Sequence, residues 1–120
     1  VTSKDGHLVK NSLVTLDPLP TQSYAFCSDT IYNEAMLPII NKVDVLYHES
    51  TFLEQDVDKC LRTGHSSAIQ AATIAKMANV KHLILGHYST RYANIDLFKE
   101  EAETVFKSVL LADDGKVFKF

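Results

Sequence analysis

The sequence predicts an α/β protein in which helices pack on a sheet. Short apolar runs, such as residues 24–28 and 81–87, end on polar residues and alternate with segments of helical spacing. At Ser67, the pattern Ser-Ala-Ile-Gln is a capping box, and alanines follow it at helical spacing. No internal repeat or low-complexity tract interrupts the chain. We therefore expect residues 1–120 to form a single unit.

In the first half of the chain, strands and helices are expected to alternate. The predicted elements are strands at residues 8–9, 13–16, 24–28 and 43–48 and helices at residues 30–41 and 52–61. The strands are short apolar runs, and the first two follow a turn at Asp5-Gly6. Pro38 is expected to kink or shorten the first helix, and Gly64 is expected to end the second.

The second half of the sequence is predicted to contain two further helices and the remaining strands of the sheet. The predicted elements are a helix from residue 67, a strand at residues 81–87, a helix capped by residue 94, and strands at residues 109–111 and 117–118. The alanines after Ser67 give that helix a narrow face that can lie close to a sheet. Asp114-Gly115 is a typical hairpin turn, so the last two strands are predicted to pair. We expect a mixed sheet with helices packed on it.

Polar residues at two strand ends are candidates for metal ligands. Asp29 follows the strand at residues 24–28, and His87 ends the strand that begins at Lys81. The carboxyl ends of strands form the edge where α/β proteins build their sites. Aspartate and imidazole suit zinc or manganese, and two carboxylate oxygens can bridge a metal pair. An aspartate before a helix is also a common cap or turn residue, so both interpretations remain open for Asp29.

Three more polar residues lie near these positions. His65 stands two residues before Ser67, at the positive end of a helix dipole, where anions are attracted and imidazolium is disfavoured. It either hydrogen-bonds the loop or takes part in a site. Ser89 and Arg91 follow His87 and could hold a phosphate, although a salt bridge is an equal alternative for the arginine.

Composition is that of ordinary globular material, with 46% hydrophobic and 22% charged residues. The net charge of −3 is a poor match for nucleic acid, because affinity for phosphate comes mainly from Lys and Arg. No apolar run approaches the roughly 18 residues of a membrane span, and no signal-peptide pattern is expected. Two cysteines without Cys-x-x-Cys spacing suit a reducing compartment, so the sequence predicts a cytoplasmic location.

Four motifs carry a resemblance to a known family. In chain order they are YAFCSDT (residues 24–30), LYHESTF (46–52), GHSSAIQAA (64–72) and LILGHYSTRY (83–92). Together they resemble the C-terminal half of ribonuclease Z, the tRNA 3′-processing endonuclease of the metallo-β-lactamase superfamily. Ser50 stands where the family usually has alanine, and Ser67 where it has threonine. The resemblance implies that the chain is the C-terminal half of an αβ/βα sandwich domain.

The resemblance also implies roles for individual residues. Asp29 matches the aspartate that bridges two zinc ions, for which manganese is an alternative, and His87 matches a histidine on one of them. In such a site, a hydroxide held by the metals attacks the phosphodiester of precursor tRNA. His65 matches the histidine that meets the scissile phosphate or the leaving oxygen, and Glu49 is the acid expected to fix its tautomer. His48 matches a position that is not a ligand, so we expect a structural histidine there.

The family's His-x-His-x-Asp-His motif is missing from these residues. The five histidines are His7, His48, His65, His82 and His87, and no two are separated by a single residue. We therefore expect half an active site, with zinc incomplete or absent and no activity in the isolated chain. The expected partners are a missing N-terminal half, precursor tRNA and, by resemblance, a second copy in a homodimer. The alternatives are a related phosphodiesterase that acts on small diesters, and a non-catalytic fragment that dimerises.

Overall fold

A four-stranded parallel sheet is the centre of the computed structural model, which describes residues 1–120. The strands are β1 (Tyr24–Cys27), β2 (Val45–Glu49), β3 (His82–Gly86) and β4 (Val109–Leu111), and they lie side by side in this order. Each strand pairs in parallel with the next, with Cys27 opposite His48 and Leu85 opposite Leu111. All four carboxyl ends therefore meet at one edge of the sheet.

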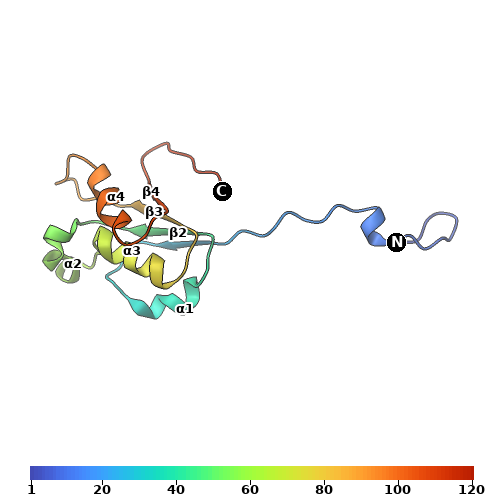
Figure 1. Cartoon of the computed structure of the whole chain (residues 1–120), viewed down its shortest axis with the longest axis horizontal. Coiled ribbons are helices and arrows are strands. Elements are labelled where there is room, and N and C mark those ends of the chain that lie inside the picture. Colours follow the sequence, from blue (N-terminus) through green and yellow to red (C-terminus); the bar gives the residue numbers. More distant parts are fainter.

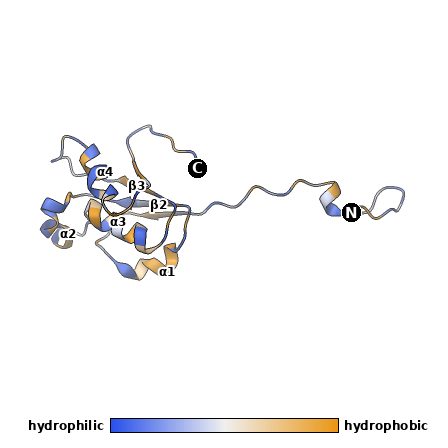
Figure 2. Cartoon of the chain, viewed as in Figure 1, coloured by the Kyte–Doolittle hydropathy of each residue, from blue (hydrophilic) through white to orange (hydrophobic).

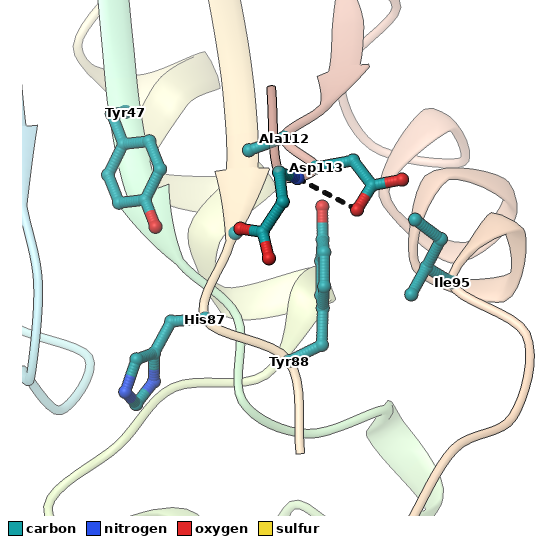
Figure 3. Close-up of a pocket in the computed structure, with 8 residues that line it drawn as sticks. Tyr47, His87, Tyr88, Ile95, Ala112 and Asp113 are labelled. Carbon is teal, nitrogen blue, oxygen red and sulfur yellow. Dashed lines mark hydrogen bonds between the residues drawn. The ribbon is translucent and has the colours of Figure 1, made fainter. Parts of the chain in front are cut away.

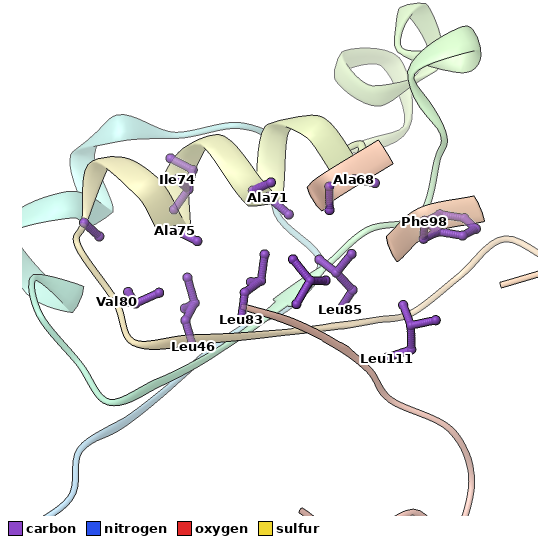
Figure 4. Close-up of a cluster of buried hydrophobic side chains, with 14 of the residues drawn as sticks. Leu46, Ala68, Ala71, Ile74, Ala75, Val80, Leu83, Leu85, Phe98 and Leu111 are labelled. Atoms are coloured by element: carbon purple, nitrogen blue, oxygen red, sulfur yellow. The ribbon is translucent and has the colours of Figure 1, made fainter. Parts of the chain in front are cut away.

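Two helices cover one face of this sheet, α3 (Ala68–Met77) and α4 (Asp96–Glu103) (Figure 1). Leu46, Leu83 and Leu85 project toward α3 and are fully buried (Figure 4). The alanines of α3 leave little side-chain bulk between helix and sheet, which permits close packing. Truncation of a leucine in such a core to alanine costs about 2–5 kcal/mol.

Different sequence patterns specify the two helices. In α3 the predicted capping box is present, since Ser67 accepts from the Gln70 amide and the Gln70 side chain accepts from the Ser67 amide. In α4, hydrophobic and hydrophilic stretches alternate (Figure 2), and Phe98 and Ala102 are buried against the core. The Asn94 side chain accepts from the Asp96 amide at the start of α4, as its predicted capping role requires.

The helical segments before α3 are shorter than the sequence predicts. Their bounds are η2 (Glu34–Met36), α1 (Leu37–Ile40), η3 (Glu54–Asp56) and α2 (Asp58–Thr63). The prediction of a helix from Thr30 is wrong at its start, because Asn33 caps η2 and the Thr30 amide donates to Glu49 instead. Pro38 stands in the first turn of α1, which is consistent with a shortened helix. Gly64 ends α2 in the left-handed conformation, as predicted.

Both ends of the chain differ from the prediction. Residues 1–23 extend away from the sheet (Figure 1) and contain the short helix η1 (Asn11–Leu13) and an isolated bridge from Thr2 to Leu8. The predicted strands at residues 8–9 and 13–16 are wrong, since they have no neighbouring strand to complete a ladder. Hydrophobic residues there, such as Leu16, remain exposed.

The predicted hairpin after β4 is also wrong. Gly115 lies in a turn closed by the bond from the Lys116 amide to the Asp113 carbonyl, but residues 117–120 form no strand. The α/β class and the packing of helices on the sheet are confirmed, while the sheet is purely parallel rather than mixed. No helix has the length and apolar character needed to cross a membrane.

The second face of the sheet carries aromatic side chains. Tyr24 and Phe26 on β1 are 61% and 63% exposed, and the Phe26 ring stacks on Tyr47 of β2 with centroids 4.5 Å apart. Tyr47 also packs over Gly86 of β3, where a Cβ atom would lie 2.8 Å from two ring carbons of the tyrosine. A side chain at residue 86 would therefore have to displace this ring.

Candidate functional site

The loops that follow β2 and β3 stay joined beyond the ends of the strands. The Ser50 amide donates to the Gly86 carbonyl at 2.9 Å, and the Ser89 amide donates to the Thr51 carbonyl at 3.0 Å. These bonds fix the chain on both sides of His87. Polar side chains that follow neighbouring strands are consequently held close to one another at the carboxyl edge.

Asp29 and His87 both occupy the left-handed backbone region, at φ 49° and φ 61°. Such angles are uncommon for residues other than glycine, and they carry strain that is often found at functional sites. The His87 Nε2 atom lies 3.6 Å from Asp29 Oδ1, and the two side chains are 44% and 71% exposed. The structure thus brings the two predicted metal ligands together at an open edge of the sheet.

Glu49, the last residue of β2, lies behind them with its side chain fully buried. Its Oε1 atom accepts from the Thr30 amide at 3.1 Å and contacts His65 Nδ1 at 2.8 Å. Its Oε2 atom accepts from the amide and the hydroxyl of Thr51, at 3.1 and 2.8 Å. Burial of a carboxylate is costly unless hydrogen bonds satisfy it, and here both oxygens are satisfied.

His65 is positioned by the short connection between α2 and α3. The left-handed Gly64 turns the chain out of α2, and the His65 amide donates to the Cys60 carbonyl at 3.0 Å. Two residues later Ser67 caps α3, so only a brief loop carries the imidazole. Its ring centroid lies 5.1 Å from that of His87. The predicted pairing of His65 with Glu49 is present in the structure as the Nδ1–Oε1 contact.

Ligand-type atoms of Asp29, His65 and His87 lie within 4.8 Å of one another. Two imidazoles and one carboxylate form a donor set that suits zinc, and a catalytic zinc commonly has three protein ligands. Each imidazole also has its Nδ1 atom beside a polar group, which is the usual arrangement around a metal-bound histidine. The residues present therefore fit a metal site, and sequence reasoning had not counted His65 among possible ligands.

Arg91 makes contacts that correspond to the predicted salt bridge. Its Nη1 atom lies 3.6 Å from Asp56 Oδ1, and its guanidinium lies over the Phe52 ring at 5.3 Å. The Nε group donates to the Ser89 hydroxyl at 3.3 Å, so these two predicted phosphate-binding residues contact each other. The Arg91 side chain is still 44% exposed. A phosphate role for the pair stays a prediction.

His48 is buried and is not part of the cluster of Asp29, His65 and His87. Its Nδ1 group donates to the Glu49 carbonyl at 2.7 Å, and its Nε2 atom has no hydrogen-bond partner. Burial lowers the pKa of His48, since the charged ring would lose its hydration, and the Glu49 carbonyl only partly opposes this effect. A neutral structural histidine agrees with these contacts.

Sequence reasoning missed two features of the carboxyl edge. Thr51 contacts both Glu49 and His87, and the only signal for it was its place in the LYHESTF motif. A hollow of about 290 Å³ lies beside His87 between Tyr47 and Tyr88 (Figure 3). Asp113, which lines it, follows β4 as Asp29 follows β1, so the rule that identified Asp29 would have found it.

Comparisons with solved structures agree with this geometry. The metallo-β-lactamase-fold protein YhfI from Bacillus subtilis aligns over 82% of this chain and 40% of its own, with a TM-score of 0.76 and 27% identity. The short form of human tRNase Z aligns over 78% of this chain and 30% of its own, with a TM-score of 0.58 and 31% identity. The chain thus has the architecture of part of a metallo-β-lactamase-fold protein.

Sequence comparisons show which metallo-β-lactamase-fold proteins the chain resembles in sequence. The ribonuclease Z of Porphyromonas gingivalis is 43% identical over 113 residues, which are 94% of this chain and 37% of that protein. The ribonuclease Z of Cytophaga hutchinsonii is 45% identical over 105 residues, which are 88% of this chain and 34% of that protein. No protein-family model matches the chain. The chain is a homologue of ribonuclease Z and spans about a third of the length of the relatives it matches.

Proposed function

We propose that this chain contributes one side of the active site of a zinc-dependent endoribonuclease that cleaves precursor tRNA at its 3′ end. The observation that carries the proposal is the convergence of Asp29, His65 and His87 at the carboxyl edge, in a homologue of ribonuclease Z. Because the chain spans about a third of its relatives, the remaining ligands would come from residues outside it. The isolated 120 residues are expected to be inactive.

Asp29 and His87 are the residues that we assign to the metals. The two Asp29 oxygens could bridge a metal pair, and His87 Nε2, at 3.6 Å from Oδ1, would contact one member of the pair. When bound, two zinc ions would polarise the scissile phosphate and activate the attacking water, and manganese could do the same. This chain's own contribution is to hold the donor atoms at the open edge of the sheet.

His65 and Glu49 are the residues that we assign to proton transfer. The buried Glu49 carboxylate accepts from His65 Nδ1, which leaves Nε2 as the free ring nitrogen of a histidine in the ligand cluster. A doubly protonated His65 could deliver its Nε2 proton to the leaving oxygen of the RNA, and the ring would return to the neutral form with its remaining proton on Nδ1. A positioned acid of this kind typically contributes about 10²–10⁴-fold to the rate.

Substrate and partners follow from the same assignment. Arg91, held between Asp56 and Phe52 and partly exposed, would bind a phosphate of the RNA together with Ser89. The proposed partners are precursor tRNA, the remainder of the enzyme, and a second copy in a homodimer. A cytoplasmic location is proposed as well, and the free thiols of Cys27 and Cys60 support it.

Two alternatives remain. The structural match to YhfI, a protein described only by its fold, specifies no substrate, so a phosphodiesterase of small diesters stays the second candidate. The exposed rings of Tyr24 and Phe26 could instead serve a non-catalytic, dimerising chain. The second candidate differs from the first in the substrate that is turned over, and the third turns over no substrate.

A chimera separates these functions. The 113 matched residues of the Porphyromonas gingivalis ribonuclease Z are replaced by those of this chain, and the product is called the chimera below. We expect the chimera to cleave precursor tRNA at the 3′ end far faster than a small chromogenic phosphodiester. Preference for the small diester would favour the second candidate, and a folded chimera without either activity would favour the third.

A further inference from the structure

Thr51 lies between the buried carboxylate and the second histidine of the cluster. Its Oγ1 atom is 2.8 Å from Glu49 Oε2 and 2.9 Å from His87 Nδ1. The residue is 8% exposed, so water does not compete freely for these contacts. The Thr51 backbone is also fixed, because its carbonyl accepts from the Ser89 amide. The hydroxyl is therefore held in one place between two polar groups.

The single hydroxyl proton determines the direction of both bonds. A carboxylate oxygen can only accept, so the Thr51 hydroxyl donates its proton to Glu49 Oε2. The hydroxyl oxygen then faces His87 Nδ1 as an acceptor, which requires a proton on that nitrogen. A neutral His87 with its proton on Nδ1 keeps its lone pair on Nε2, and Nε2 is the atom that faces Asp29.

The tautomer of His65 is fixed in the same way, but without an intervening hydroxyl group. His65 Nδ1 contacts Glu49 Oε1 directly at 2.8 Å, so its proton also lies on Nδ1 and its lone pair on Nε2. One buried carboxylate thus serves two imidazoles, one directly and one through a hydroxyl. Both Nε2 atoms then keep a lone pair, and both histidines belong to the metal-type cluster.

We propose that Thr51 is a positioning residue that extends the Glu49 carboxylate to His87 and fixes the tautomer of His87 with Nε2 free to bind a metal. This inference rests on the proposed function for the use of Nε2 but not for the tautomer itself. Outer-shell partners of ligating histidines typically change metal affinity by 10–100-fold. The hydroxyl, rather than the bulk of Thr51, is the group that carries this effect.

Two variants of the 120-residue chain isolate the hydroxyl. Thr51→Val removes the hydroxyl and keeps the branched shape, whereas Thr51→Ser keeps the hydroxyl and removes the methyl group. The tautomers are read without metal from long-range ¹H–¹⁵N NMR spectra of ¹⁵N-histidine-labelled protein, at about pH 8, above the usual imidazole pKa. We expect His87 in one Nδ1-protonated tautomer in the wild type and in Thr51→Ser, and in a mixture in Thr51→Val.

Two results would contradict the proposed role of Thr51 in fixing the His87 tautomer. One is an unchanged His87 tautomer in Thr51→Val, and the other is a Thr51→Ser variant as altered as Thr51→Val. The wild-type spectrum is informative by itself if Thr51→Val fails to fold, because an Nε2-protonated His87 contradicts the proposal directly. The His65 signals serve as an internal control, since Glu49 holds that ring without Thr51.

Zinc affinity supplies the second readout. In competition of the chimera with a chelating dye, we expect Thr51→Val to bind zinc at least about 10-fold more weakly than the unaltered chimera, and Thr51→Ser to be close to it. Equal affinities of all three proteins, with the expected tautomer change, would overturn the part of the proposal that concerns metal. A chimera that binds no zinc would overturn the metal assignment under Proposed function, and the NMR spectra of the 120-residue chain would still decide the role of Thr51.

Discussion

The Nδ1 atom of His65 lies 2.8 Å from Oε1 of Glu49, and the Glu49 side chain is completely buried. The two residues come from different layers of the fold, since Glu49 ends a central strand and His65 lies in the loop between two helices. A buried carboxylate with one imidazole on it can orient that ring and stabilise its charge during proton transfer. The pair is therefore expected to act as one unit.

The first prediction concerns this unit. In the chimera, Glu49→Gln and His65→Ala should each lower the rate of precursor tRNA cleavage by about 10²–10⁴-fold, because the positioned acid is lost. The double variant should be little slower than His65→Ala alone, since the carboxylate has no ring left to orient. Single-turnover rates measure this. Multiplied losses, or loss of bound metal from either variant, would assign the two residues to separate roles.

A second prediction uses the backbone of Asp29. At φ 49° a glycine is unstrained, whereas an alanine has no polar side chain to offset the strain. Asp29→Gly should therefore be more stable than Asp29→Ala by about 1 kcal/mol, as measured by denaturant unfolding of the 120-residue chain. Both variants remove the carboxylate, so the comparison is matched. Equal stability of the two would show that the left-handed conformation is not kept in solution.

A third prediction concerns the contact between Gly86 and Tyr47. A Cβ atom at residue 86 would meet the Tyr47 ring at 2.8 Å, so Gly86→Ala should cost about 1–3 kcal/mol of unfolding free energy. The cost should shrink in a Tyr47→Ala background, where the ring is gone, and shrink only partly in Tyr47→Phe. A cost that is the same in all three backgrounds would contradict the contact.

The fourth prediction is a pH dependence caused by His48. Burial lowers its pKa in the folded chain, so the unfolded chain binds the proton more readily. This contribution to stability is complete above the unfolded pKa of about 6.5 and is lost as the pH falls below it, at no more than about 1.4 kcal/mol per pH unit. His48→Asn keeps a donor for the Glu49 carbonyl but does not titrate.

The measurement for His48 compares unfolding free energies of the two proteins between about pH 8 and pH 5. We expect the wild type to lose stability on acidification faster than His48→Asn. The other four histidines are present in both proteins and cancel in the difference. Parallel pH profiles would show that His48 is protonated as easily in the folded chain as in the unfolded one.

Local signals allowed much of the fold to be predicted. The α3 helix follows from the Ser67 capping box, because that motif is complete within four residues. Asp29 and His87 could be identified as neighbours because each follows a strand of a parallel sheet. The four family motifs indicated ribonuclease Z, and the comparisons confirm that resemblance.

The errors arose where neighbours in space decide the outcome. Residues 13–16 have strand-like composition, yet no strand lies beside them to accept their hydrogen bonds. The turn at Gly115 is present, but the chain after it does not return along β4. The role of Thr51 also depends on a residue 36 positions away, His87, so the LYHESTF motif alone could not indicate that contact.

Asp29 is the residue that we propose joins two metal ions. The number of metals bound to the chimera, measured by elemental analysis alongside precursor tRNA cleavage, tests this claim. We expect two metals per active site and cleavage in the chimera, and fewer metals with no cleavage in its Asp29→Ala variant, because the shared carboxylate is lost. An Asp29→Ala variant that keeps two metals and normal turnover would contradict the claim.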